Sequence, residues 1–146
     1  MLYTLRKCLI SDFNFLFDLK KQNFQKYVDT YWKWDDEEQK EKLRIDLEEH
    51  LSHKHIILMN NKEIGVYVFH ITEKGDCFLN ELSLLNEYQG KGIGTDILKN
   101  QLKENEEKKI RTILQVFKNN PAKKLYERLG FTVFGETETH YQMEKN

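Results

Sequence analysis

Apolar residues recur along the chain with two different spacings, and these spacings predict where strands and helices form. Short stretches that are apolar at every second position, or almost throughout, are typical of strands. Strands are therefore predicted at residues 2–9, 55–59, 63–71, 77–85, 112–117, 131–134 and 139–144. A spacing of three to four residues predicts helices after Ser11, over residues 35–50, from Ile93 to about Lys108 and from Pro121 to Gly130. We expect Ser11 to cap the first helix and Pro121 to take the first position of the last one.

The order of these elements places strands early and alternates strands with helices later, so the pattern predicts a mixed α/β protein. No linker, repeat or low-complexity segment interrupts it. A chain of 146 residues, 39% of them hydrophobic and 32% charged, has the size and composition of one globular domain. We therefore expect residues 1–146 to form a single domain.

Composition excludes several classes of function. Lys and Arg number 23 and Asp and Glu 24, a balance that argues against a nucleic-acid binder. No apolar run approaches the roughly 18 residues of a membrane-spanning helix, and the N-terminus lacks the apolar block of a signal peptide. Cys8 and Cys77 have no metal-ligand spacing, and the five histidines form no metal pattern. These features predict a cytoplasmic protein without a membrane partner or a metal.

Three of the seven glycines lie in one short stretch, EYQGKGIGTDIL, at residues 87–98. Gly90, Gly92 and Gly94 follow a predicted strand and lead into a predicted helix. Glycines at such a junction let several backbone N–H groups point at a ligand, and the positive end of the helix dipole favours a phosphate or pyrophosphate. Neither the Walker A pattern nor the dinucleotide pattern G-x-G-x-x-G fits. A surface turn without a ligand is the alternative.

A second motif makes the first one specific. The order strand, Gln-x-x-Gly-x-Gly and helix resembles the acyl-CoA site of the GNAT superfamily of N-acetyltransferases. The segment NNPAKKLYERLGF, residues 119–131, is similar to that family's Asn-x-x-Ala-x-x-Leu-Tyr-x-x-x-Gly-Phe helix. Asn119 takes the family's Asn position, and Asn120 is expected to cap the helix. Residues 27–39 and 136–145 also look like segments of a bacterial GNAT subgroup whose acceptor is undefined.

This resemblance implies a fold, a donor and a reaction. The fold is α+β, with a central, mostly antiparallel twisted sheet of six or seven strands, flanked by about four helices and splayed between the fourth and fifth strands. The donor is acetyl-CoA, and its acetyl group passes to a primary amine by direct attack in a ternary complex. A non-catalytic module that holds an acyl-CoA on the same fold is one alternative, and a regulatory or interaction domain that binds a nucleotide is another.

The resemblance also implies which residues hold the donor. In the family the glycine loop wraps the CoA pyrophosphate with backbone amides, and the strand before it pairs with the pantetheine arm. The cofactor-binding residues expected on this basis are Leu84, Leu85, Gln89, Gly90, Lys91, Gly92, Ile93, Gly94, Thr95, Asn119 and Lys124. Lys124, with Lys123 and Arg128, either contacts the 3′-phosphate of CoA or belongs to an exposed basic face.

Acetyl transfer to an amine needs a base for the ammonium proton and an acid for the departing thiolate. Tyr126 takes the family's Tyr position and is expected to be the acid, although a Tyr on an apolar helix face is also typical of a core. Strand alternation places Glu81 on the opposite face from Leu82 and Leu84, where it is expected to act as the base. A surface role for Glu81, with a water chain as the base, is the alternative.

Aromatic residues suggest where the acceptor binds. Tyr27, Tyr31, Trp32 and Trp34 precede two aspartates, and aromatic faces with carboxylates favour a cationic amine. Packing of the aromatics, and acidic residues at a helix start, explain the same pattern without a ligand. The subgroup resemblance adds His140. The sequence does not distinguish a small-molecule amine from a protein amine, and the resemblance also allows a homodimer through the C-terminal strands.

Overall fold

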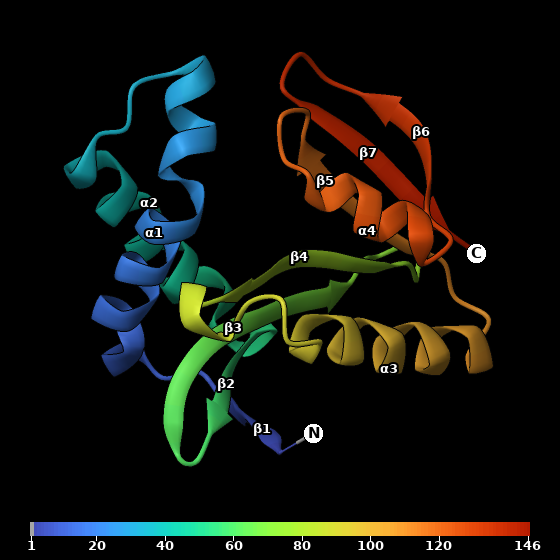
Figure 1. The fold of residues 1–146 in the computed structure, drawn as a ribbon, viewed down its shortest axis with the longest axis horizontal. Helices are drawn as coiled ribbons and strands as arrows, with labels where there is room; N and C mark the ends of the chain where they lie inside the picture. Colours follow the sequence, from blue (N-terminus) through green and yellow to red (C-terminus); the bar gives the residue numbers. More distant parts are fainter. Residues whose placement is uncertain (1) are drawn as a thin grey trace. The chain divides into compact units, whose positions relative to one another are not determined.

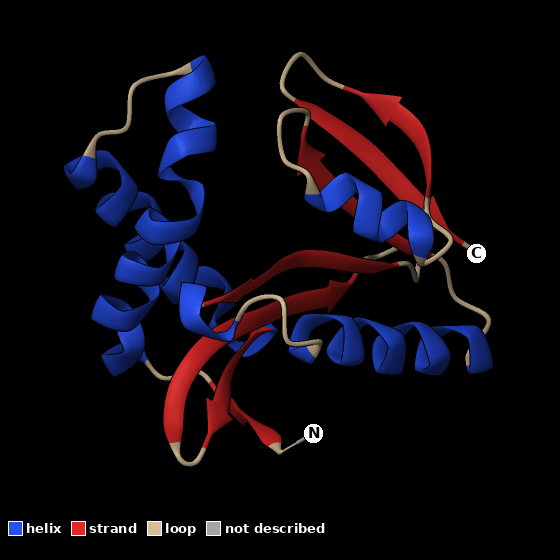
Figure 2. Ribbon diagram, viewed as in Figure 1, coloured by secondary structure: helices blue, strands red, loops and turns tan. Residues whose placement is uncertain are grey.

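In residues 2–146, which the computed structural model describes, seven strands form one sheet with the order β1-β2-β3-β4-β5-β7-β6 (Figure 1). The strands are β1 (Tyr3–Lys7), β2 (Lys54–Met59), β3 (Lys62–Ile71), β4 (Cys77–Leu84), β5 (Thr112–Phe117), β6 (Thr132–Glu136) and β7 (His140–Lys145). The α-helices are α1 (Phe13–Tyr31), α2 (Asp36–His50), α3 (Ile93–Glu107) and α4 (Ala122–Arg128). Three short 3-10 helices are η1 (Ile10–Asp12), η2 (Leu51–His53) and η3 (Asn86–Tyr88), and Figure 2 separates helices from strands.

Strand pairing in the sheet is mixed. Four neighbouring pairs, β1–β2, β2–β3, β5–β7 and β6–β7, are antiparallel, whereas β4 and β5 are parallel. The parallel pairing joins Cys77–Leu79 to Thr112–Leu114, and the sheet is splayed where this short pairing ends. The predicted fold class, a mostly antiparallel sheet splayed between its fourth and fifth strands and flanked by four helices, is confirmed.

The chain divides into two compact units, and each is described by itself. Unit 1 contains the chain up to Val68 together with Glu81–Gly94, and unit 2 contains Phe69–Asn80 and Thr95–Asn146. The chain passes between the units within β3, within β4 and near the start of α3. The sequence-based expectation of one domain over residues 1–146 stays a prediction.

The core of unit 1 joins α1 and α2 to β2 and β3. Its buried members are Cys8, Leu16, Phe17, Leu19, Trp34, Leu43, Leu47, Ile56, Val66 and Val68. Asp35 caps α2, since its side chain accepts a hydrogen bond from the N–H of Glu38 at 3.0 Å. Asn60 and Asn61 both have positive φ, which suits the tight turn between β2 and β3.

The start of α1 differs from the prediction. Asp12, not Ser11, is the residue before the first helical position, and it is also the last residue of the 3-10 helix η1. The carboxylate of Asp12 accepts two hydrogen bonds from Arg6, each 2.9 Å long, and a third from the N–H of Leu9 at 2.8 Å. These bonds fix Asp12 next to β1, so α1 begins at Phe13.

Unit 2 contains a buried polar chain between α3 and β5. Gln101 donates a hydrogen bond to Asn105 at 3.0 Å, and Asn105 donates one to the hydroxyl of Thr112 at 2.7 Å. The buried apolar side chains of unit 2 are Cys77, Leu79, Ile97, Leu98, Leu114, Val116, Phe131 and Met143. Buried polar groups need hydrogen-bond partners, so these two hydrogen bonds favour one register of α3 on β5.

The last helix follows the prediction with a shift of one residue. Pro121 precedes α4 as its N-cap, and the helix starts at Ala122. The predicted cap, Asn120, lies one residue before the N-cap, although its side chain does accept a hydrogen bond from the N–H of Ala122 at 2.9 Å. Gly130 follows the helix with φ +100°, a conformation that glycine adopts without steric cost.

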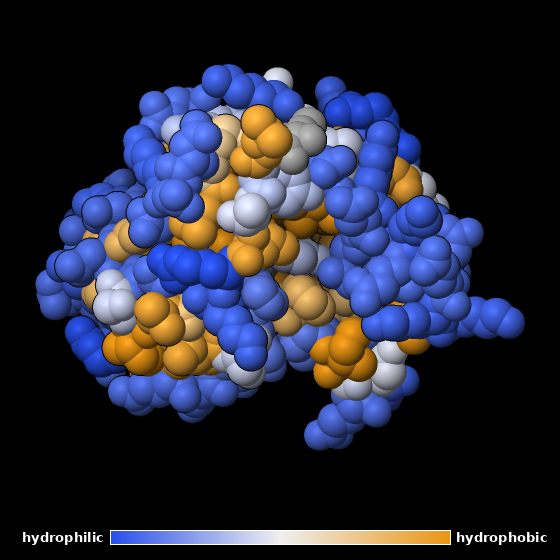
Figure 3. Space-filling view, turned by 90° about the horizontal axis from the view of Figure 1, so that it is seen from below, coloured by the Kyte–Doolittle hydropathy of each residue, from blue (hydrophilic) through white to orange (hydrophobic). Residues whose placement is uncertain are grey.

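Polar side chains cover most of the face shown in Figure 3, and apolar side chains form small groups between them. Cys8 in unit 1 and Cys77 in unit 2 are both free and buried. Among residues 2–146, no helix is long and apolar enough to span a membrane.

Candidate functional site

The glycine stretch forms a tight turn between η3 and α3. Gly90 has φ +72° and Gly92 has φ +85°, both in the left-handed region that favours glycine. Ile93, the first residue of α3, is only 3% exposed and anchors the turn in the apolar interior. Gly94 lies in the first turn of α3, where an added Cβ would be 3.7 Å from the side chain of Leu82. Gly90, Lys91 and Gly92 are therefore exposed, whereas Ile93 at the start of α3 is buried.

This turn has the features of an anion site. The first N–H groups of an α-helix have no partner within the helix, and they carry the positive end of its dipole. The 15-residue helix α3 begins directly after Gly92. Lys91 is exposed in the turn, with its ammonium 5.9 Å from the centre of the Tyr88 ring. Thr95 is partly exposed in the first turn of α3. The arrangement suits a phosphate or pyrophosphate.

The polar groups next to the glycine turn are bonded to one another. The side-chain amide of Gln89 donates to the carbonyl of Leu84 at 2.8 Å, and Asn23 of α1 donates to the same carbonyl at 3.0 Å. The N–H of Leu85 donates to the carbonyl of Ile64 at 2.8 Å. These bonds hold the end of β4 against the turn. Sequence reasoning missed Asn23, because its partner lies 61 residues further along the chain.

Glu81 lies on the same face of β4 as Ser83. The hydroxyl of Ser83 donates a hydrogen bond to Oε2 of Glu81 at 2.9 Å. Leu82 and Leu84, by contrast, approach Gly94 on the α3 side. Burial raises the pKa of the Glu81 carboxyl above its ordinary value, and the Ser83 hydrogen bond only partly opposes this effect. A carboxyl with a raised pKa is suited to accept a proton near neutral pH.

Two lysines from other elements act on Glu81. The positive charges of Lys54 and Lys20 both lower its pKa, whereas the negative charge of Asp46 raises it. Lys54 is buried and forms an ion pair with Asp46 of α2. Burial lowers the pKa of Lys20 itself. These residues come from α1, α2 and β2, and nothing in the sequence around any of them marks the cluster.

Tyr126 lies on α4 in unit 2. Its ring packs edge-on against Phe131, with ring centres 5.9 Å apart. Burial raises the pKa of its hydroxyl, so the phenol keeps its proton over the physiological range. The side chain is partly exposed, and a phenol that keeps its proton is available as a proton donor.

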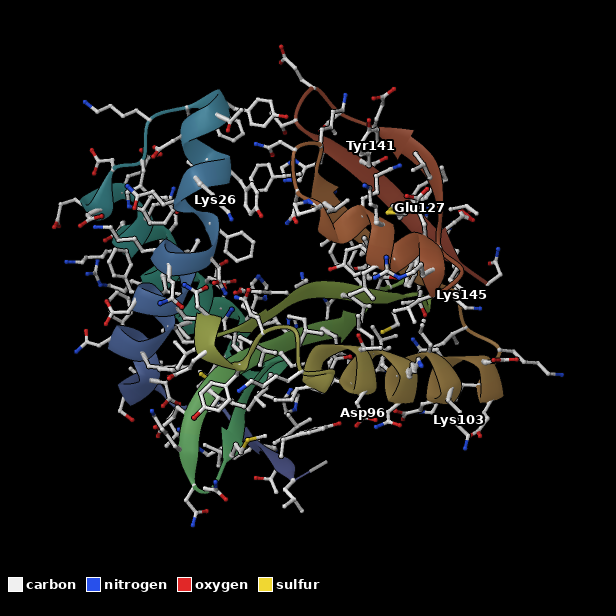
Figure 4. The ribbon with its side chains drawn as sticks, in the orientation of Figure 1. Lys26, Asp96, Lys103, Glu127, Tyr141 and Lys145 are labelled. Carbon is white, nitrogen blue, oxygen red and sulfur yellow. The ribbon has the colours of Figure 1, made fainter. Side chains whose placement is uncertain are left out.

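Other basic and polar residues of this segment are exposed. Asn119 and Lys124 lie at the surface of unit 2. Lys123 pairs with Glu127 at 3.4 Å, and its ammonium lies 5.0 Å from the centre of the Tyr141 ring. Figure 4 labels Glu127 and Tyr141. Since Lys123 already has an anionic partner, Lys124 is the freer of the two neighbours to meet an added phosphate.

The aromatic residues proposed for the acceptor fall into two groups. Trp32 is 56% exposed after the end of α1, and Tyr31 lies beside it with ring centres 5.8 Å apart. Tyr27 is partly exposed one turn earlier, under the ammonium of Lys26 at 5.0 Å, and Lys26 is labelled on α1 in Figure 4. Trp34 is instead part of the core.

Trp34 is only 8% exposed, with its ring 6.4 Å from that of Phe17 and its indole N–H donating to Asp36 at 2.7 Å. Its packing and its hydrogen bond account for this side chain without a ligand. We therefore do not carry Trp34 into the acceptor surface.

A groove of about 520 Å³ runs along the polar face of α1. It is open to solvent and lined by Asp18, Lys21, Gln22, Gln25, Lys26 and Asp29. Its charged residues are two aspartates and two lysines, so their formal charges cancel.

His140 begins β7 in unit 2 and pairs with Phe117 of β5. Their rings lie 4.1 Å apart, and Nδ1 of His140 lies 2.7 Å from the hydroxyl of Thr139. Burial lowers the pKa of the imidazole, which favours its neutral form. Within residues 2–146, no group of three or more His, Cys, Asp and Glu side chains is arranged to hold a metal ion.

Comparison with known proteins places this geometry in a family. Residues 51–133, more than half of the chain, match the family described as acetyltransferase (GNAT) domain. The structure is similar to that of PaiA N-acetyltransferase from Thermoplasma acidophilum in complex with coenzyme A. The two share 23% identity and a TM-score of 0.77, over 100% of this chain and 99% of that one.

Two further solved structures are similar over nearly the whole chain. Naa50 from Arabidopsis thaliana, in complex with the bisubstrate analogue CoA-Ac-MVNAL, has 19% identity and a TM-score of 0.69, over 100% and 99% of the two chains. The ribosomal-protein-S18-alanine N-acetyltransferase from Escherichia coli has 17% identity and a TM-score of 0.67, over 97% and 92%. At such identities the likeness concerns the fold. The comparison with curated proteins finds no match.

Proposed function

The chain belongs to the acetyltransferase (GNAT) family, and we propose that it transfers the acetyl group of acetyl-CoA to a primary amine by direct attack in a ternary complex. One observation carries the proposal. Gly90 and Gly92 have positive φ and lead directly into the fixed start of the long helix α3. A pyrophosphate group is the anion that suits this turn, and in a protein of this family CoA supplies it.

The donor is acetyl-CoA, held by the turn and by the strand before it. Backbone N–H groups of Gly90 to Thr95 contact the pyrophosphate, and Lys91 adds a nearby positive charge. The end of β4 at Leu84 and Leu85 lies along the pantetheine arm. Asn119 and Lys124 of unit 2 meet other polar parts of CoA. The structure of PaiA N-acetyltransferase with coenzyme A supports the choice of donor.

Glu81 is the base in this mechanism. An aliphatic amine is mostly protonated at neutral pH and must lose a proton before it can attack. Glu81 accepts that proton, and the amine nitrogen then forms a bond to the thioester carbonyl carbon. The buried environment that raises the pKa of Glu81 makes it a stronger base than an exposed carboxylate.

Tyr126 is the acid. When the C–S bond breaks, the electron pair stays on the sulfur of CoA, and the Tyr126 hydroxyl protonates this thiolate. The phenol is protonated at the start of the step, because burial raises its pKa. Deprotonated Tyr126 takes the second proton from the nitrogen as the amide forms, and Glu81 returns the first proton to solvent, so the products are a neutral amide and CoA with a free thiol.

The acceptor is a cationic amine that binds beside exposed aromatic rings. Trp32, Tyr31 and Tyr27 supply faces that attract a positive charge, and His140 is a further proposed acceptor residue. Among the proteins of similar fold, Naa50 was crystallised with the bisubstrate analogue CoA-Ac-MVNAL, and another is named ribosomal-protein-S18-alanine N-acetyltransferase. We propose a primary amine as the acceptor, and the assay below distinguishes a polyamine from a protein N-terminus. The free cysteines fit a cytoplasmic location, and the C-terminal strands are the proposed surface of a homodimer.

The test uses the purified protein in two stages. Calorimetric titration with acetyl-CoA, and with ATP as the comparison, measures donor binding. Release of free CoA thiol is then followed against polyamines, amino acids, aminoglycosides and short peptides with free N-termini. Binding of acetyl-CoA with turnover on one amine class supports the proposal. Absence of acetyl-CoA binding, or a preference for ATP, would overturn it, and binding without turnover on any amine would favour a non-catalytic acyl-CoA module.

A further inference from the structure

Asn23 links the first helix to the donor site. Its side-chain N–H donates to the carbonyl of Leu84 at 3.0 Å, and its side-chain oxygen accepts a hydrogen bond from Gln89 at 3.2 Å. Gln89 donates to the same Leu84 carbonyl at 2.8 Å and lies next to Gly90 of the glycine turn. One carboxamide of α1 therefore touches both the strand that ends before the turn and the residue that starts it.

We propose that Asn23 is a positioning residue that couples the glycine turn to α1, so that donor binding at the turn orders the helix that carries the acceptor aromatics. The proposal rests on the proposed function for its ligand, since the turn must bind CoA. It adds a residue and a coupling that the binding site itself does not require.

The link uses both ends of the Asn23 side chain. A carboxamide can donate and accept at once, whereas a carboxylate can only accept and a methyl group can do neither. The neighbouring Gln22 adds a parallel bond, because its side-chain oxygen accepts from the N–H of Asn86 at 3.2 Å. Two successive residues of α1 thus bond to the segment between β4 and the turn.

The position of Asn23 on α1 explains what the link would transmit. Residues three or four apart lie on one face of a helix, so Asn23, Tyr27 and Tyr31 follow one another along the same side. Lys20, one turn before Asn23, acts electrostatically on Glu81. This side of α1 therefore has Lys20, which acts on the proposed base Glu81, at one end. The proposed acceptor residues Tyr27 and Tyr31 lie at the other end, and Asn23 lies between them.

Coupling of this kind is reciprocal. If CoA favours the arrangement in which Asn23 holds both partners, then that arrangement of α1 also favours CoA, and both effects have the same size. Loss of Asn23 should weaken CoA binding and should also remove the response of α1 to CoA. If Asn23 only stabilised the fold, its loss could weaken CoA binding, but bound CoA would still change α1.

The experiment measures amide hydrogen exchange of α1 with and without CoA as the probe. In the natural protein, CoA should slow exchange in residues 24–31 by roughly tenfold, the scale of a typical coupling between sites. In Asn23→Ala, CoA should still bind, with about tenfold weaker affinity by calorimetry, but it should leave exchange in α1 unchanged. Asn14→Ala, an exposed change on the same helix, serves as the matched control and should behave as the natural protein.

A second variant keeps the test valid if Asn23→Ala folds poorly. Asn23→Asp has the same shape and can accept from Gln89, but it cannot donate to Leu84. It should also lose the response of α1. The coupling is wrong if CoA binds the natural protein without slowing exchange in α1, or if CoA slows exchange in Asn23→Ala and Asn23→Asp as much as in the natural protein. Should CoA fail to bind the natural protein, the proposed function fails first, and the two results are distinguishable.

Discussion

Ser83 and Glu81 share one face of β4, where the Ser83 hydroxyl donates a hydrogen bond to the Glu81 carboxylate at 2.9 Å. The alternation of the strand sends Leu82 and Leu84 to the other face, toward Gly94. This part of the strand therefore carries a polar pair on one face and two leucines next to Gly94 on the other. Burial and the Ser83 hydrogen bond together set the pKa of the Glu81 carboxyl.

Removal of the carboxylate should stop the reaction without removing the donor. We expect Glu81→Gln to lower kcat/KM for the amine by on the order of 100-fold, because a positioned base contributes at least that factor. Affinity for acetyl-CoA should not change. Steady-state thiol release and calorimetry measure the two quantities. Glu37→Gln, an exposed change on α2, is the control, and full activity in Glu81→Gln would exclude Glu81 as the base.

Loss of the Ser83 hydroxyl should move the pH profile. The hydrogen bond from Ser83 lowers the pKa of Glu81, so Ser83→Ala should raise this pKa further. The reaction needs ionised Glu81 and is lost as the pH falls through its pKa. The acidic limb of kcat/KM against pH should therefore shift to higher pH in Ser83→Ala. An unchanged limb would mean that another group controls it.

The phenol of Tyr126 can be tested in the same assay. Tyr126→Phe should lower kcat by on the order of 100-fold at unchanged affinity for CoA, since the ring and its packing on Phe131 remain. The raised pKa of Tyr126 places its ionisation on the alkaline side, so the alkaline limb of the natural enzyme should shift or disappear in the variant. Tyr3→Phe on β1 is the control. Turnover that is the same at every pH would rule out Tyr126 as the acid.

Two glycines of one turn should respond differently to the same change. At Gly90 an added Cβ meets no atom within 4 Å, so Gly90→Ala is unfavourable only because φ is +72°. That conformation costs an alanine about 1–2 kcal/mol, or roughly 5–30-fold in affinity for CoA if the turn must keep it. Gly94→Ala lies in a helix and makes only ordinary contacts. It should bind CoA nearly as well as the natural protein. Calorimetry on both variants compares them, and equal affinities would contradict a role for the positive φ.

The sequence predicts well the features that depend only on residues close together in the chain. Period-two stretches become strands at nearly the predicted positions, and the glycine turn has positive φ at Gly90 and Gly92. The shared face of Glu81 and Ser83 follows from alternation alone. Even so, the cap of α1 is predicted one residue early, because the bond from Arg6 to Asp12 joins residues of different elements.

Features that depend on contacts between distant segments cannot be found this way. Asn23 bonds to Leu84 across 61 residues, and Lys20 and Lys54 act on Glu81 from two other elements. Trp34 is an example in which the local sequence suggests a site and contacts with distant residues explain the side chain instead. A local pattern of aromatics and aspartates fits an acceptor site, but packing on Phe17 and a hydrogen bond to Asp36 explain this side chain.

The two buried thiols determine how the reaction can be followed. Burial raises the pKa of Cys8 to about 11 and also raises that of Cys77, so neither is a reactive thiolate at the pH of an assay. A chromogenic disulfide added to the folded enzyme should therefore report only the sulfhydryl of released CoA. The same reagent would label Cys8 or Cys77 only in molecules that have opened, so a slow background colour would count unfolding events while the catalytic signal is recorded.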